Sequence, residues 1–363
     1  MKVAHFIDSG GFYGAERMLI ELILASTTDI EHTVYSIGEP NQTEKPLEKE
    51  LKRHNIAFKV VRMPKFSLGR ARQLLLDVEK DGTQIAHSHG YKFNIYFGLL
   101  KHKLNSMKCV ATIHGYVPVR LPQKLWFYHL VETALFQKLD KLFLVSPHMQ
   151  FFPKFRHLKR DKVTTIVNGI KASKNSVVSR CQNGCISLLF VGRLSPEKGV
   201  ADLIEIVNRV NKDGKPVSLT VIGDGPLKSL LMKKVSQLEM TNVVSFLGYV
   251  DAPSARMCEF SALVINSITE GVPITLLEAM SEGLPIISTN VGGIHHVLGD
   301  EYPYICSVDS KMNLEEKIRA FLKTDDETKK RLGEYVYHRF NTYFTACIMA
   351  QRYTFEYKKV LKG

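Results

Sequence analysis

The sequence predicts an α/β protein with two domains, each built on a parallel β-sheet that helices cover on both faces. Three observations predict this class. The chain has 363 residues, more than one hydrophobic core usually organises. Short apolar stretches of strand length alternate with helical stretches in both halves, which is typical of parallel sheets. Residues 173–184 are polar and lack periodicity, so they predict a linker.

The first predicted domain covers residues 1–172 and begins with a strand, a glycine-rich turn and a helix. The turn holds Gly10, Gly11 and Gly14. Their spacing departs from G-x-G-x-x-G, so a phosphate-binding turn and an ordinary tight turn both remain open. We expect strands at residues 3–7, 32–36, 57–61, 85–88, 108–113, 141–145 and 163–167. We expect helices at residues 15–26, 46–54, 69–80, 91–101 and 123–139.

The second predicted domain covers residues 185–341 and repeats the alternation. We expect strands at residues 186–191, 218–222, 243–247, 262–265 and 285–288. We expect helices at residues 199–212, 226–238, 273–282, 313–322 and 327–340. Residues 342–363 are rich in aromatic side chains and predict a last helix that packs back on the first domain.

Composition excludes several classes of protein. Apolar residues make up 45% of the chain and charged residues 23%, as in soluble globular proteins. We find neither an apolar run of membrane-spanning length nor a signal-peptide pattern, and therefore expect a cytoplasmic protein. The six cysteines are scattered. Cys181 and Cys185 lack a second pair of ligands nearby, so we expect reduced thiols rather than a zinc site.

The positive charge is concentrated in the first half. Residues 1–175 carry 27 Lys and Arg against 15 Asp and Glu, whereas the rest carries 22 against 21. A basic half favours contact with nucleic acid, an anionic membrane surface or a phosphorylated substrate.

The stretch from residue 266 to residue 296 carries the strongest functional signal. The apolar run at residues 262–265 predicts a strand, and Pro273 suits the first turn of the helix that follows. Free N–H groups at such a helix start can hold an anion. Glu270 lies in the loop and Glu278 in the helix, so these two carboxylates do not share one helix face.

A second strand-to-helix turn carries two cations. Arg193 and Lys198 follow the predicted strand at residues 186–191. An Arg fork and a Lys point charge can together hold a diphosphate. A solvated turn is the alternative, and the Glu270–Glu278 stretch favours the diphosphate site.

These motifs together resemble the retaining glycosyltransferases of family 4. The residues that carry the resemblance are Gly192-Arg193-Leu194, Glu197-Lys198-Gly199, Glu270-Gly271, Leu277-Glu278-Ala279-Met280, Gly283, Pro285 and Gly292-Gly293. The resemblance covers most of the chain and implies a GT-B fold, in which two Rossmann-like domains face a central cleft. This sequence has Gly-Val-Pro-Ile after Glu270, where many members of the family have Gly-Phe-Gly-Leu.

The resemblance also implies roles for single residues. Arg193 and Lys198 would bind the donor diphosphate, Glu278 would accept both ribose hydroxyls, and Glu270 would contact hydroxyls of the transferred sugar. His114 would face that sugar from the other domain. The distal phosphate would lie on backbone N–H groups of the loop and helix start, formed by Gly271, Val272, Pro273, Ile274 and Thr275.

Further positions are implied more loosely. Gly10 and Gly11 would let the backbone approach the diphosphate and the acceptor, since neither has a side chain. Gly223 and Tyr249 would line the pocket for the base. Because Arg193, Lys198 and the helix start can stabilise the leaving diphosphate, and no convincing Asp-x-Asp follows a strand, we expect neither a metal nor a cofactor. In an alternative mechanism, Glu270 would act as a covalent nucleophile.

The expected donor is a UDP-sugar, or next a GDP-sugar, that carries a hexose or N-acetylhexosamine. The expected acceptor is a glycan or a polyprenyl-diphosphate-linked glycan of cell-surface polysaccharide synthesis. Residues 151–160 mix aromatic and cationic side chains, and Leu125 is followed by the aromatic run 126–128. Such patches favour peripheral contact with the inner face of the plasma membrane, although a core aromatic cluster beside solvated cations would give the same pattern.

Three other functions stay open on the sequence. Another GT-B enzyme, an epimerase or phosphorylase, would turn over the donor without an acceptor alcohol or would need phosphate. An oxidoreductase would leave both glutamates unexplained. A non-catalytic protein that binds nucleotide sugars or nucleic acid would exploit the basic half, but the chain lacks a recognisable nucleic-acid module, and we expect no nucleic-acid partner.

Overall fold

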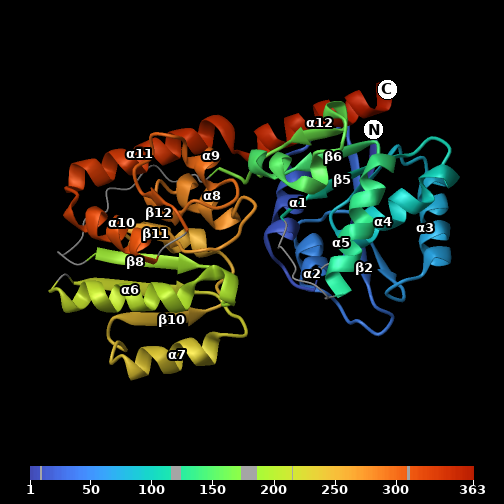
Figure 1. Cartoon of the computed structure of the whole chain (residues 1–363). Helices are drawn as coiled ribbons and strands as arrows, with labels where there is room; N and C mark the ends of the chain where they lie inside the picture. The colour runs from blue at the N-terminus through green and yellow to red at the C-terminus, as the bar shows by residue number, and fades with distance from the viewer. Residues whose placement is uncertain (9, 116–123, 173–185, 215, 309–310) are drawn as a thin grey trace. The chain divides into compact units, whose positions relative to one another are not determined.

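The structure is a computed structural model that describes residues 1–363 apart from 9, 116–123, 173–185, 215 and 309–310. It divides into two compact units, one formed by Met1–Lys171 with Ala346–Gly363 and the other by Ala172–Thr345. The predicted linker therefore lies outside the described residues, and so do Cys181 and Cys185. Each unit contains one parallel β-sheet with helices around it (Figure 1), which confirms the predicted α/β class.

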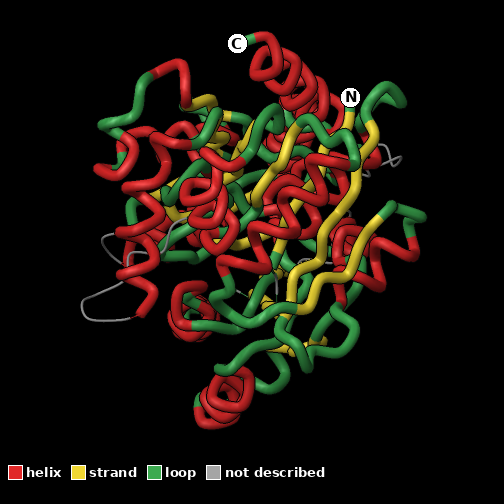
Figure 2. The backbone as a smooth tube through the Cα atoms, turned by 90° about the vertical axis from the view of Figure 1, so that its right-hand side faces the viewer, coloured by secondary structure: helices red, strands yellow, loops and turns green. Residues whose placement is uncertain are grey.

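The first unit is built on a seven-stranded sheet in the order β3-β2-β1-β4-β5-β6-β7. Its strands are β1 (Lys2–Ile7), β2 (Glu31–Gly38), β3 (Phe58–Arg62), β4 (Ile85–Ser88), β5 (Lys108–Ile113), β6 (Lys141–Leu144) and β7 (Val163–Thr165). Its helices are α1 (Gly14–Ala25), α2 (Pro46–Arg53), α3 (Leu68–Lys80), α4 (Tyr91–Leu100), α5 (Lys124–Leu135) and α12 (Ala346–Lys362). Figure 2 shows strands that run side by side with helices around them.

Side chains from β1 contribute to two separate apolar clusters. Phe6 packs with Phe93 and Phe97 of α4 in one cluster, and Ile7 packs with Leu19 of α1 in another. Successive side chains of a strand point to opposite faces of its sheet. Both faces of this sheet are therefore covered, which explains why its strands are apolar almost throughout.

The last helix, α12, belongs to the first unit. It packs against α1 and buries the rings of Tyr353 and Tyr357. The Tyr357 hydroxyl lies 2.6 Å from His87 Nδ1, and the Tyr353 hydroxyl lies 2.9 Å from Thr112 Oγ1. The end of the chain thus supplies polar partners to the middle of the sheet.

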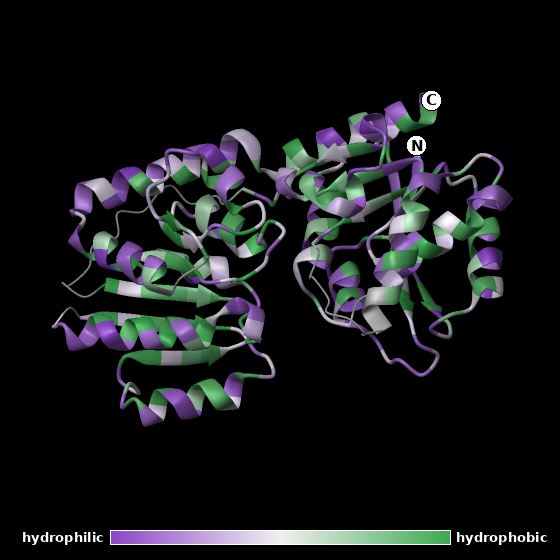
Figure 3. Ribbon diagram, in the orientation of Figure 1, coloured by the Kyte–Doolittle hydropathy of each residue, from purple (hydrophilic) through white to green (hydrophobic). Residues whose placement is uncertain are grey.

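The second unit is built on a six-stranded sheet in the order β10-β9-β8-β11-β12-β13. Its strands are β8 (Ile186–Val191), β9 (Val217–Ile222), β10 (Val244–Gly248), β11 (Ala262–Ile265), β12 (Ile286–Thr289) and β13 (Ile305–Cys306). Its helices are α6 (Val200–Lys212), α7 (Lys228–Gln237), α8 (Ile274–Ser281), α9 (Ile294–Leu298), α10 (Lys311–Lys323) and α11 (Asp326–Tyr343). Figure 3 shows hydrophobic residues along β8 and mixed hydropathy along α6, as expected for a covered sheet and an amphipathic helix.

Several expected elements differ in the structure. Pro273 precedes α8 with an extended backbone (ψ 131°), so the helix begins at Ile274 and not at Pro273. The predicted strand 163–167 ends at Thr165. The sequence missed α9 and the two-residue strand β13 because both are too short to show a period. Among the helices that the structure describes, none combines the length and the apolarity that a membrane crossing requires.

Candidate functional site

The turn after β8 is fixed against the loop after β11. Residues Pro196–Lys198 form a short 3₁₀ helix, and Gly199 follows in the left-handed region at φ 65°. A Cβ on Gly199 would lie 2.2 Å from the backbone oxygen of Asn266. The Asn266 side chain donates to the Gly199 carbonyl at 2.8 Å, and the N–H of Ile268 donates to the Glu197 carbonyl at 2.9 Å. Only glycine fits at position 199.

This contact brings together two predicted site residues. The Lys198 ammonium donates to Glu270 Oε1 at 2.5 Å, and the Ser267 hydroxyl donates to the same oxygen at 2.6 Å. The side chains of Lys198 and Glu270 are 24% and 11% exposed. The pair is therefore mostly covered yet still reached by water. Arg193 lies in the same turn and is exposed.

The two glycines at positions 292 and 293 support the other side of the loop after β11. The N–H of Gly293 donates to the Gly271 carbonyl at 2.7 Å. Gly292 has φ 58°, and a Cβ there would lie 2.1 Å from the Glu270 carbonyl. The loop that carries Glu270 and Gly271 is thus held between two backbone segments.

Helix α8 positions the remaining residues predicted to hold the donor. Val272 and Ile274 are buried, whereas Thr275 in the first turn is half-buried. Glu278, one turn further along, is 1% exposed. A carboxylate placed that deeply is costly unless something compensates it, which sets Glu278 apart from the surface glutamates.

The structure gives the predicted base-pocket residues different roles. Gly223 has φ 137°, its N–H donates to the Gly248 carbonyl at 2.7 Å, and a Cβ on it would lie 1.9 Å from the Gly192 carbonyl. Its glycine is required by backbone packing beside the β8 turn. Tyr249 is 65% exposed.

In the first unit, the glycine-rich turn leads into α1. A Cβ on Gly11 would lie 2.5 Å from the Tyr13 ring, whereas a Cβ on Gly10 would meet nothing within 4 Å. The backbone at Gly10 is therefore accessible, and a side chain at Gly11 would displace the exposed Tyr13 ring. Glu16 accepts from the N–H of Tyr13 at 2.7 Å and holds the start of the helix.

His114, predicted from the end of β5, is the last of four histidines joined by hydrogen bonds. His114 Nε2 lies 3.1 Å from His89 Nδ1, His89 Nε2 lies 3.0 Å from His5 Nδ1, and His5 Nε2 lies 2.9 Å from His32 Nδ1. We name these four residues the histidine chain. This chain was not predicted from the sequence, although His5 and the neighbouring His87 occupy paired positions on β1 and β4.

Burial keeps these imidazoles neutral. It lowers the pKa of His114 and of His32 to about 4 and holds the pKa values of His5, His87 and His89 well below the ordinary value. His87 lies beside the histidine chain, its ring centroid 4.2 Å from that of His89, and contacts Tyr357 and Thr112 instead.

The nitrogen atoms of His5, His87 and His89 that could bind a metal lie within 4.8 Å of one another. Both nitrogens of each of these rings, however, already have a hydrogen-bond partner. Metal binding would require breaking several of these bonds, so the arrangement fits a hydrogen-bonded core.

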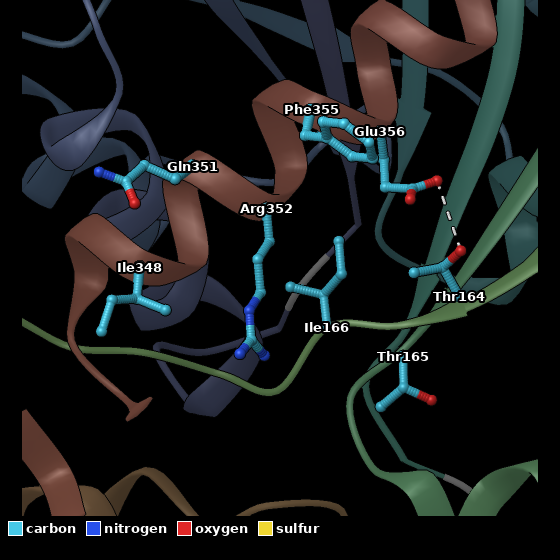
Figure 4. A pocket seen from close by; sticks show the side chains of 8 residues that line it. All are labelled: Thr164, Thr165, Ile166, Ile348, Gln351, Arg352, Phe355 and Glu356. Carbon is cyan, nitrogen blue, oxygen red and sulfur yellow. Dashed lines mark hydrogen bonds between the residues drawn. The ribbon is translucent and has the colours of Figure 1, made fainter. Parts of the chain in front are cut away.

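A separate cavity of about 350 Å³ lies between β7 and α12 in the first unit. Its lining is amphipathic and contains none of the predicted site residues (Figure 4). The lining residues are Thr164, Thr165, Ile166, Ile348, Gln351, Arg352, Phe355 and Glu356. Thr164 donates to Glu356 at 3.4 Å across one edge.

Comparison with known proteins identifies the class and then the family. Solved structures with the same fold include Anabaena Alr3699/HepE in complex with UDP, at a TM-score of 0.82, 17% identity, and coverage of 99% of this chain and 100% of that one. The fold is therefore GT-B, with two Rossmann-like units. Residues 12–174 match the model Glycosyltransferase Family 4, and residues 174–339 match Glycosyl transferases group 1. The chain belongs to the family 4 glycosyltransferases.

Relatives with curated descriptions agree with this assignment. The chain is 28% identical over 292 residues to an uncharacterised glycosyltransferase of Methanocaldococcus jannaschii, covering 77% of both chains. It is 27% identical to a Mycobacterium tuberculosis glycogen synthase, over 61% of this chain and 56% of that one. It is also 27% identical to the yeast phosphatidylinositol N-acetylglucosaminyltransferase GPI3 subunit, over 63% and 52%. The chain thus spans about half the length of the latter two.

We predict that Gly223→Ala destabilises the second unit by at least ~2 kcal/mol, because a Cβ would collide with backbone in a conformation that L side chains rarely adopt. Gly214→Ala is the matched control. Gly214 also has a positive φ (75°) but open space around it, so its cost should be about 1 kcal/mol. Urea denaturation measures both, and equal losses would contradict the steric explanation.

Stability should fall in mild acid. In the unfolded chain, histidines take up protons near pH 6.5. In the folded chain, His32 and His114 stay neutral until about pH 4 because burial lowers their pKa. Stability is therefore complete above pH 6.5 and decreases toward pH 4, by about 2 kcal/mol per group at pH 5. Calorimetry should show Tm dropping by several degrees between pH 6.5 and 5.

The same experiment on two variants isolates the histidine contribution from that of the carboxylates. His32→Asn should flatten the drop, whereas His102→Asn, which replaces an exposed histidine, should leave it unchanged. A Tm that stays constant down to pH 5 in the parent chain would refute the prediction.

Proposed function

We propose that this chain is a retaining, metal-independent glycosyltransferase that transfers a hexose or N-acetylhexosamine from a nucleotide-diphosphate sugar. The observation that carries the proposal is the Lys198–Glu270 pair, a cation and a carboxylate held together at the ends of β8 and β11. Surface salt bridges contribute little to stability. A mostly covered pair fixed by two loops is better explained by ligand binding.

The charges of the second unit suit a donor with a diphosphate in its middle. Lys198 and the exposed Arg193 would neutralise phosphate oxygens, and the N–H groups at the start of α8 would add donors. Glu278 would accept from both hydroxyls of the ribose, since a carboxylate has two acceptor oxygens. Glu270 would accept from hydroxyls of the transferred sugar.

Donor binding would then rearrange the pair. Lys198 shares its ammonium with Glu270 in the structure, and a diphosphate would compete for that ammonium with a larger negative charge. Glu270 would keep the bond from Ser267 and gain sugar hydroxyls as donors. The contact that holds the two loops together would therefore change when the donor binds.

The transfer step breaks the bond between the anomeric carbon and the phosphate oxygen and forms a bond to the acceptor oxygen on the same face. The departing phosphate takes the acceptor proton, so no separate base is required. Negative charge grows on the leaving diphosphate, where Arg193, Lys198 and the helix start would stabilise it. Those cations supply the stabilisation that a divalent metal would otherwise provide.

UDP is the first candidate for the nucleotide, and GDP is the next. The Anabaena HepE structures, which share the fold, contain UDP or UDP-glucose. The proposed acceptor is a glycan or a polyprenyl-diphosphate-linked glycan of cell-surface polysaccharide synthesis. The basic first half of the chain suits an acceptor that carries phosphate.

We also propose that the first unit docks on an anionic membrane surface at the inner face of the plasma membrane. Helix α5 exposes Phe127 (58%), Leu130 (55%) and Val131 (43%), and amphipathic surfaces of this kind enter the interface between lipid and water. In residues 151–160, Phe155 is buried while Phe151 is 70% exposed. This segment therefore supplies an aromatic anchor as well as exposed cations.

Removing the donor contacts should abolish transfer. Arg193→Ala and Glu278→Ala should each lower kcat/KM with the preferred nucleotide sugar by on the order of 10²-fold or more, because each loses a charged contact to the donor. Arg209→Ala is the control, since Arg209 pairs with Glu315 away from these loops. A thermal-shift panel of UDP, GDP, ADP and their sugars identifies the donor first.

The proposal fails if both variants retain transfer within about threefold of the parent. Donor turnover without an acceptor alcohol would instead indicate an epimerase, and a requirement for inorganic phosphate would indicate a phosphorylase. Binding of nucleotide sugars without any turnover would indicate a non-catalytic binding protein.

Membrane docking predicts a specific loss of vesicle binding. The double variant Phe127→Glu, Leu130→Glu should abolish co-sedimentation with vesicles of anionic phospholipid at low salt, because it places two negative charges at the apolar surface. Phe355→Glu is the control, since Phe355 is equally exposed (66%) on α12. Absence of binding by the parent chain would end the docking proposal and leave the transfer proposal intact.

A further inference from the structure

The histidine chain has a direction. Each link joins Nδ1 of one ring to Nε2 of the next: His114 Nε2 to His89 Nδ1, His89 Nε2 to His5 Nδ1, and His5 Nε2 to His32 Nδ1. A neutral imidazole carries one N–H and one lone pair. One proton must lie in each link, so the tautomer of any ring determines the tautomers of the other three.

Two arrangements of protons satisfy all three links. In the first, every ring carries its proton on Nδ1, so His114 presents an N–H at its far side and His32 Nε2 has a bare lone pair. In the second, every ring carries its proton on Nε2, so His32 Nε2 bears an N–H and His114 presents a lone pair. The chain can adopt only these two states without breaking a bond.

The ends of the chain distinguish the two arrangements. His114 Nδ1 and His32 Nε2 are buried atoms, and neither has a hydrogen-bond partner among the described residues. As a residue, His114 is partly exposed whereas His32 is buried, so the His114 end is the one that a ligand could satisfy. A buried N–H without a partner is rarer in proteins than an unsatisfied acceptor. The arrangement that leaves a lone pair at His32 is therefore favoured.

We propose that His89, His5 and His32 are positioning residues that fix His114 in its Nδ1–H tautomer, so that His114 binds its ligand as a hydrogen-bond donor. The ligand class is a hydroxyl or other oxygen acceptor. The inference deepens the proposed function and rests on it for the identity of that ligand, a hydroxyl oxygen of the transferred sugar.

The hydrogen-bond chain crosses the sheet from β2 to the end of β5. His32 lies on β2, His5 on β1, His89 directly after β4 and His114 directly after β5, and these four strands are neighbours in the sheet. The sheet holds each ring at a fixed separation from the next. Because the sheet fixes the distances between the rings, a change at His5 should alter the tautomer of His114, two rings away.

The inference is tested by NMR of the full-length chain labelled with ¹⁵N-histidine at pH 7.5, where Nδ1–H and Nε2–H tautomers have different ¹⁵N shifts. We expect His114 to carry its proton on Nδ1 in the parent chain. In His5→Gln, whose side-chain amide can either donate to His89 Nε2 or accept from it, a substantial share of His114 should convert to the Nε2–H form.

His87→Gln is the matched control. His87 is buried as completely as His5 and contacts the His89 ring, but it is not a member of the chain. This variant should lose stability as His5→Gln does while His114 keeps its tautomer. A parent His114 with its proton on Nε2, or an equal tautomer change in the His5 and His87 variants, overturns the inference.

Kinetics provide a second measurement. Against the preferred nucleotide sugar, His5→Gln should lower kcat by about tenfold with a smaller change in KM, whereas His87→Gln should stay within about twofold of the parent. Equal kcat values in the two variants would also overturn the inference. Stoichiometric zinc binding by the purified chain would overturn it as well, because zinc would take the nitrogens that form the links. If no nucleotide sugar is turned over, the proposed function fails, and the NMR measurement still decides the tautomer.

Discussion

The backbone contact between the turn after β8 and the loop after β11 is the constraint on which the rest of the second unit's site depends. β8 and β11 are parallel neighbours, so their carboxyl ends meet at one edge of the sheet. Gly199 allows the two segments to touch, and Asn266 then bonds across the gap. Lys198 and Glu270 are 72 residues apart in the chain, and this close approach of the two segments is what brings them together.

The other glycines of the second unit extend the same principle. Gly292 and Gly223 each lie where a Cβ would collide with a backbone carbonyl, and both have positive φ. From the sequence, Gly223 was assigned to the base pocket, and Gly292 was one of the residues that carry the family resemblance. Their direct role is to let loops pack at backbone distance, and any ligand contact comes through the loops that they hold in place.

The sequence predicted the alternation of strands and helices because each strand is a short apolar run buried on both faces. It also predicted Lys198 and Glu270 as site residues, through the spacing of their motifs. It could not predict their ion pair, because that contact depends on the positions of two loops. The histidine chain was missed for a related reason: His5 and His32 are 27 residues apart, and only the register of the strands brings their rings together. Short elements such as β13 carry too few residues for any period.

The polar groups that we consider in the two units differ in charge and in burial. The second keeps its cations where water still reaches them, at Lys198 and Arg193, because a charge costs less there and remains available to a phosphate. In the first unit, the buried histidines stay neutral, so the imidazoles of His5 and His89 satisfy one another at little electrostatic cost. Charged groups suit the recognition of phosphates, and neutral donors suit hydroxyls. Each unit therefore offers a ligand a different kind of polar contact.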